Sequence, residues 1–147
     1  MAFQTILIAV DASPYALKAA RTGCELARAC GATVTLVYVI DTVLELSNID
    51  GGEFPDQARP RERAAGQTLL AELSQNVGAG LTVQTLMPEG KPTELMLAAI
   101  TDTGADLLVI GTHDRSGLLH LLQGSLTDYA LRHSQVPVLV VPTHRST

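Results

Sequence analysis

Short apolar runs alternate with longer segments of mixed polarity along this chain. Five runs rich in valine, isoleucine and leucine are typical of strands buried on both faces of a sheet; they span residues 6–10, 33–40, 81–87, 106–110 and 138–141. Helices are predicted between them, at residues 14–29, 57–76, 93–103 and 125–133. Ser13 and Pro14 open the first helix, and Gly31, Gly78 and Gly104 end the first three. This alternation predicts an α/β domain with one parallel sheet, helices on both faces and right-handed crossovers.

Composition narrows the class of protein. The chain has 147 residues, of which 46% are hydrophobic and 17% charged, and this length predicts a single domain over residues 1–147. A net charge of −5 without a basic cluster argues against nucleic acid or an anionic membrane surface as partner. No apolar run reaches about 18 residues, and the run at 6–10 is too short for a signal peptide. We therefore expect a cytoplasmic protein without a membrane span.

Polar residues and glycines follow several of the predicted strands directly. Asp11 follows the first strand, residues 39–41 close the second, Gly90 follows the third and Gly111 ends the fourth. In open parallel sheets, ligands bind outside the carboxyl ends of the strands. We expect these four strand ends to converge on one crevice. A long stretch at 41–55, which shows no clear helix or strand pattern, begins at the same place.

The stretch 107–126 has the pattern of a phosphate cradle. An apolar run ends on Gly111, a polar loop follows, and Gly124-Ser125 is predicted to open the last helix. Ser125 and Asp128 loosely match a capping box. A helix that begins there directs free N–H groups and a partial positive charge outward, where an anion is stabilised. The same residues also allow an ordinary helix cap without any ligand.

The spacing within this stretch resembles that of a known family. Residues 111–125 read G-x2-D-x9-G-S, which is similar to the G-x2-G-x9-G-[ST] signature of the universal stress proteins. ILIAVDAS at 6–13 and VYVID at 37–41 resemble the first two strands of that family, so the resemblance covers the whole chain. It implies a flavodoxin-like, adenine nucleotide alpha hydrolase-like architecture: an open, doubly wound, five-stranded parallel sheet in the strand order 3-2-1-4-5.

The resemblance also implies an adenine-nucleotide site. Asp11 and the backbone of Val39 would hold the nucleoside, with Val39 against the adenine. Gly111 would lie against the ribose and phosphates. Position 114, together with the residues at 124–126, would wrap the phosphates. The full implied set is Ala9, Asp11, Val39, Ile110, Gly111, Asp114, Arg115, Gly124, Ser125 and the Leu126 amide.

Asp114 departs from the family pattern, which has glycine at this position. A carboxylate about 5 Å from a phosphate charge costs on the order of 3 kcal/mol at an effective dielectric of 20, roughly a hundredfold in affinity. Mg²⁺ that bridges Asp114 to a phosphate would turn the penalty into a ligand. The neighbouring Arg115 either offsets the carboxylate and contacts phosphate or is a solvated loop charge. We therefore expect a nucleotide site that is weakened for ATP.

The last apolar run has the character of an edge strand. Residues 136–142 are apolar and β-branched, and an exposed edge must be covered or paired. Pairing with the same strand of a second copy would give a two-fold dimer. The family resemblance implies the same dimer. The predicted interface comprises Val136, Val138, Leu139, Val140 and Val141.

Three functions are open at this point. The first is adenine-nucleotide binding (ATP, ADP or AMP, with or without Mg²⁺) in stress response or signalling, without efficient turnover. The second is a dimeric stress protein that binds no nucleotide and acts through protein contacts. The third is a slow ATP hydrolase, which ranks last because no residue stands out as a general base.

Other chemistries find little support in the sequence. There is no P-loop, dinucleotide fingerprint or G-x-S-x-G elbow, although His113, Ser125 and Asp11 could be drawn as a hydrolytic triad. The four histidines lack a metal-binding spacing, so no intrinsic metal site is expected. Cys24 and Cys30 lie six residues apart in a predicted helix, which favours reduced thiols over a disulfide.

Overall fold

Five parallel strands form the central sheet. The computed structural model describes residues 3–14, 16–42, 55–112 and 118–142, and for residues 55–59 and 118–125 it describes the backbone only. The sheet strands are β1 (Thr5–Val10), β2 (Thr33–Tyr38), β4 (Val83–Leu86), β6 (Leu107–Gly111) and β7 (Val138–Val141). Their spatial order is β4-β2-β1-β6-β7, and every neighbouring pair is parallel. This is the predicted order 3-2-1-4-5, so the predicted fold is confirmed.

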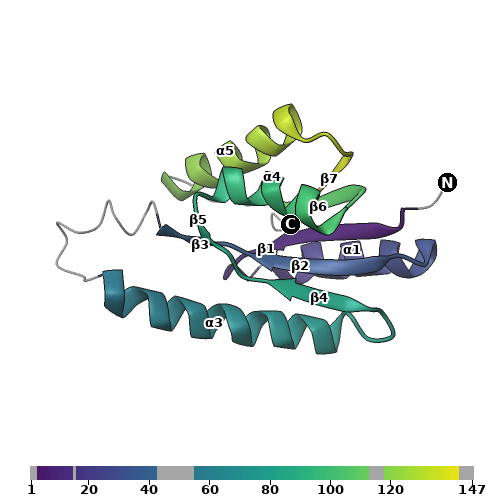
Figure 1. Ribbon diagram of the computed structural model, residues 1–147, viewed down its shortest axis with the longest axis horizontal. Helices are drawn as coiled ribbons and strands as arrows, with labels where there is room; N and C mark the ends of the chain where they lie inside the picture. Colours follow the sequence, from purple (N-terminus) through teal and green to yellow (C-terminus); the bar gives the residue numbers. More distant parts are fainter. Residues whose placement is uncertain (1–2, 15, 43–54, 113–117, 143–147) are drawn as a thin grey trace, which may run out of the picture.

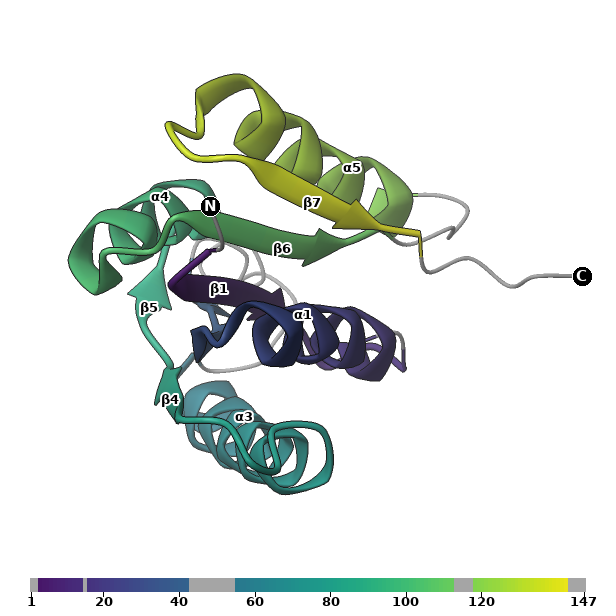
Figure 2. The same cartoon turned by 90° about the vertical axis from the view of Figure 1, so that its right-hand side faces the viewer.

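In the described part of the chain, four helices cover the two faces of the sheet (Figures 1 and 2). They are α1 (Ala16–Cys30), α3 (Pro55–Asn76), α4 (Pro92–Thr103) and α5 (Leu118–His133). Side chains of α1 and α3 pack in one core, and those of α4 and α5 pack in another. Among the described helices, none is long and apolar enough to cross a membrane.

β1 connects the two cores. Ile6 and Ile8 belong to the core under α1 and α3, whereas Leu7 belongs to the core under α4 and α5. All three side chains are fully buried. Helix α1 packs closely on this strand because Gly23 faces it: a Cβ on Gly23 would lie 2.4 Å from Ile8 Cδ1. A strand buried on both faces explains the uninterrupted apolar run in the sequence.

Two charged side chains fix element ends through backbone groups. The Asp106 carboxylate accepts hydrogen bonds from the N–H of Gln4 (2.9 and 3.2 Å) and of Thr5 (3.1 Å), which ties the start of β1 to that of β6. The Arg28 guanidinium donates to the carbonyls of Val77 and Ala79, just beyond the end of α3. Arg28 thereby joins α1 to α3 and satisfies carbonyls at the end of a helix.

The second predicted strand is divided in the structure. The sequence predicts one strand over 33–40, but β2 ends at Tyr38 and a short strand β3 (Ile40–Asp41) follows after Val39. β3 pairs in parallel with β5 (Glu89–Gly90) in a separate two-stranded sheet. The prediction was wrong at this point because an apolar run does not reveal a change of pairing partner from β4 to β5.

The start of the last helix is a second correction. Gly124-Ser125 was predicted to open it, but α5 already begins at Leu118. The residues from Leu118 to Gln123 are mostly leucine, a strong helix former, and this preference outweighs the capping signal at Ser125. The first helix differs in the same respect, since it begins at Ala16 rather than Pro14. Its predicted end is confirmed: Gly31 follows Cys30 with a φ of 70°.

The Asp106 contacts lead to a stability prediction. Replacing Asp106 with alanine removes the acceptor for two backbone N–H groups, and we expect a loss of about 1–3 kcal/mol in unfolding free energy. Urea unfolding followed by circular dichroism measures it. Asp102→Ala, at an exposed position in α4, is the matched control. Equal stability of the two variants would show that the Asp106 contacts contribute little.

Candidate functional site

The carboxyl ends of the strands place several predicted site residues side by side. Ala9 of β1 is in register with Val37 of β2 on one side and with Ile110 of β6 on the other. Asp11 comes two residues after Ala9, Val39 two after Val37, and Gly111 one after Ile110. The predicted nucleoside end (Ala9, Asp11, Val39, Ile110 and Gly111) is therefore brought together at one edge of the sheet, at the left in Figure 1.

Asp11 shapes the turn between β1 and α1. Its Oδ1 accepts a hydrogen bond of 3.0 Å from the Ser13 N–H, as in an Asx turn. The Ser13 carbonyl in turn accepts from the Ala16 N–H at 3.3 Å, at the first residue of α1. This local bond holds the carboxylate in one orientation at the strand end. Asp11 is thus part of the structure of the turn as well as of the predicted site.

Val39 occupies the break between β2 and β3. It belongs to neither strand, and the next residue, Ile40, donates its N–H to the Pro88 carbonyl at 2.9 Å. The Val39 side chain is half-buried and packs against the core under α4 and α5. The backbone therefore changes sheets at the position where the resemblance implies a backbone contact to adenine.

Tyr38 is a residue of this edge that the sequence reasoning missed. It is the last residue of β2, is in register with Val10, and is only 5% exposed. Helix α3 contacts the Tyr38 ring at Gly66. A Cβ on Gly66 would lie 2.9 Å from Tyr38 Cδ1 and 2.7 Å from Met87 Sδ, so a larger residue would not fit there without a shift. A glycine in the middle of a helix was the one signal in the sequence that pointed to such a close approach.

The electrostatic surroundings of Tyr38 connect α3 to β1. Burial raises the pKa of the Tyr38 phenol, and the negative charges of Glu62 and Asp11 raise it further. Glu62 belongs to α3 and Asp11 follows β1. Carboxylates from two separate elements therefore act on one buried phenol at the carboxyl edge.

Part of the predicted phosphate end lies within α5. The first few N–H groups of a helix lack an intrahelical partner, and α5 begins at Leu118. Gly124, Ser125 and Leu126 lie further along α5, so the helix does not present their N–H groups to an anion. The side chain of Leu126 is half-buried and packs against the core under α4 and α5. Asp114 and Arg115, like His113, lie outside the described residues.

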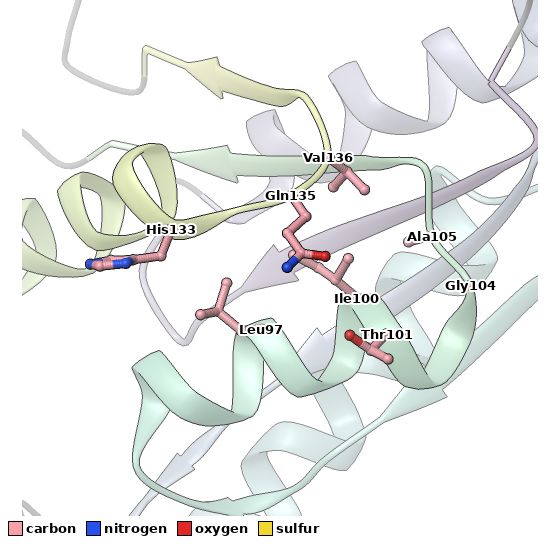
Figure 3. Close-up of a pocket in the computed structure, with 8 residues that line it drawn as sticks. All are labelled: Leu97, Ile100, Thr101, Gly104, Ala105, His133, Gln135 and Val136. Carbon is pink, nitrogen blue, oxygen red and sulfur yellow. The ribbon is translucent and has the colours of Figure 1, made fainter.

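A pocket of about 380 Å³ lies beside the amino-terminal ends of the strands, on the opposite side from the predicted site (Figure 3). Ala105 and Val136, which come shortly before β6 and β7, mark this as the amino-terminal edge. The His133 ring points away from the other labelled side chains. The lining residues are Leu97, Ile100, Thr101, Gly104, Ala105, His133, Gln135 and Val136. None of them belongs to the predicted nucleotide site.

Metal ligands do not gather in the part of the chain that the structure describes. No group of three or more His, Cys, Asp or Glu side chains there is arranged to hold an ion. The Mg²⁺ contact expected at Asp114 falls outside the described residues and stays a prediction.

Comparison with known proteins establishes the family. A sequence model of the universal stress protein family matches residues 2–142. The chain belongs to this family. A universal stress protein of Thermus aquaticus is 30% identical over 139 residues, which cover 95% of this chain and 98% of the relative. The resemblance inferred from the motif is thereby confirmed.

Solved structures of universal stress proteins share the fold. MJ0577 of Methanocaldococcus jannaschii, whose biochemical function was assigned from its structure, superposes with a TM-score of 0.79 at 24% identity, covering 99% of this chain and 100% of that one. A universal stress protein solved in complex with cAMP gives a TM-score of 0.72 at 23% identity, with 98% and 100% coverage. At these identities the likeness shows the fold alone.

The raised pKa of Tyr38 predicts a change in alkaline stability. In the unfolded chain the phenol ionises near pH 10, whereas in the folded protein it stays neutral to a higher pH. Its stabilising contribution is therefore complete below about pH 10 and is lost as the pH rises toward the folded-state value. Tyr38→Phe cannot ionise, so we expect it to lose less unfolding free energy than the native protein above about pH 10. Urea unfolding at stepped pH tests this, and parallel curves for the two proteins would contradict it.

Proposed function

We propose that this universal stress protein binds an adenine nucleotide at the carboxyl edge of its sheet and acts in stress response or signalling without efficient turnover. The observation that carries the proposal is the register of β1, β2 and β6, which brings Asp11, Val39 and Gly111 side by side. The motif at 111–125 supports it from the sequence. A universal stress protein of the same fold has been solved with cAMP, which is consistent with a nucleotide at this edge.

The two ends of the proposed nucleotide rest on different parts of the chain. The nucleoside lies against Asp11 and the backbone of Val39. The phosphates lie toward Gly111, position 114 and the amino end of α5, which starts on the same side because it follows the carboxyl end of β6 (Figure 1). In this arrangement the amino end of α5, which begins at Leu118, takes the anion-binding role that the sequence assigned to Gly124 and Ser125.

Asp114 sets the expected preference among nucleotides. Without Mg²⁺, we expect calorimetric titration to give affinities that fall from AMP to ADP to ATP. Asp114→Asn removes the negative charge, and ATP affinity should then rise by up to roughly a hundredfold. The matched control is Asp102→Asn, at the far end of α4, which should bind like the native protein.

Two outcomes of these titrations are decisive. Submicromolar ATP binding by the native protein without metal would show that Asp114 does not repel phosphate. Flat titrations with all three nucleotides would favour the alternative function, in which the protein acts through its protein contacts alone.

The position of β7 at the end of the sheet supports a dimer, whether or not the protein binds a nucleotide. β7 lies at the end of the sheet and pairs on one side with β6. Val138, Leu139 and Val140 are half-buried within the single chain. We propose that the side of β7 that pairs with no described strand pairs instead with β7 of a second copy, which would complete the burial of these side chains.

A charge on β7 should disrupt this dimer. We expect Val138→Lys and Val140→Lys to convert the native dimer to monomer or aggregate, as measured by light scattering coupled to size exclusion. Leu86→Lys is the matched control. Leu86 is 36% exposed on β4, the outermost strand on the other side of the sheet from β7. A β7 variant that keeps the dimer mass would refute the interface.

A further inference from the structure

Helix α3 is held over the carboxyl edge by an ion pair. The Arg63 guanidinium contacts the Glu89 carboxylate of β5. Glu89 is in register with Ile40, the residue that directly follows Val39. Arg63 of α3 therefore lies near β3, the strand that begins directly after Val39.

The contact of α3 with Tyr38 gives a second point on the same helix. Gly66 lies against the Tyr38 ring, at the end of β2. α3 runs from the carboxyl edge, where β3 ends, back toward the start of β4, as Figure 1 shows. At a rise of about 1.5 Å per residue, Glu62 lies about 6 Å nearer the carboxyl edge than Gly66. Glu62 is therefore level with the residues just beyond Tyr38.

The direction of Glu62 follows from its spacing. Residues four apart lie on the same side of a helix, so Glu62 shares the side on which Gly66 meets Tyr38. Glu62 is half-buried, whereas Glu72 further along α3 is exposed. Its charge acts on the Tyr38 phenol together with that of Asp11, which agrees with this placement.

We propose that Glu62 is a further nucleoside-binding residue, whose carboxylate accepts hydrogen bonds from the uncharged donors of the nucleoside. This proposal rests on the proposed function. The donors in question are the ribose hydroxyls and the exocyclic amine of adenine, since an ionised carboxylate accepts hydrogen bonds only. Glu62 and Asp11 also repel phosphate, whereas the amino end of α5 attracts it. The nucleotide is therefore oriented with its nucleoside toward α3 and its phosphates toward α5.

Adenosine is the sharpest probe because it carries no phosphate. We expect Glu62→Ala to weaken adenosine binding about tenfold or more in calorimetric titrations, the range for a hydrogen bond to a charged acceptor. Glu72→Ala is the matched control on the same helix and should bind adenosine like the native protein. Thermal unfolding of both variants shows whether either change disturbs the fold. Three analogues identify the donor: inosine lacks the exocyclic amine, and 2′-deoxyadenosine and 3′-deoxyadenosine each lack one ribose hydroxyl. For the analogue that lacks the donor, Glu62→Ala and the native protein should bind equally.

Each result decides between the proposals. Binding of adenosine by the native protein, with a loss confined to Glu62→Ala, supports the role of Glu62. Unchanged or tighter binding by a folded Glu62→Ala variant overturns it and leaves the proposed function standing. Absence of binding of adenosine, AMP and ATP by the native protein overturns the proposed function, and the role of Glu62 with it.

Discussion

The pairing of β1 with a strand on each side is the interaction on which the rest of the structure depends. β1 lies at the centre of the sheet, and its side chains alternate between the two cores. Its register with β2 and β6 sets which residues stand level at the carboxyl edge. A shift of one residue would exchange the two faces of the strand and also separate Asp11 from Val39. Folding and the candidate site are therefore fixed by the same pairing.

Much of the fold could be predicted because the strands are buried on both faces. Continuous apolar runs give strands with approximate ends, and β7 was predicted over its full length, Val138–Val141. The glycine stop at Gly104 is also confirmed, with a φ of 68° after α4. These signals are local: they depend on burial or on the backbone freedom of a single residue.

The parts that could not be predicted depend on partners distant in sequence. The break at Val39 arises because the chain pairs with β4 before it and with β5 after it. Helix α5 starts before Ser125 because the helix propensity of the leucines outweighs the capping signal at Ser125. The approach of Gly66 to Tyr38 joins segments that no periodicity relates. At the candidate site, the strand-end residues followed from topology. The approach of the Glu62 charge to Tyr38 could not be predicted, because a position in a helix does not show what the side chain faces.

The Arg28 contacts have a consequence for how α3 tolerates changes in length. Arg28 holds the carbonyls just beyond the far end of this helix, while Arg63 and Gly66 are matched to Glu89 and Tyr38 nearer its start. One inserted residue between these points would turn one end against the other by about 100° and lengthen the helix by about 1.5 Å. Only one set of contacts could then survive. The contacts at the two ends of α3 therefore fix the number of residues between Arg63 and Val77.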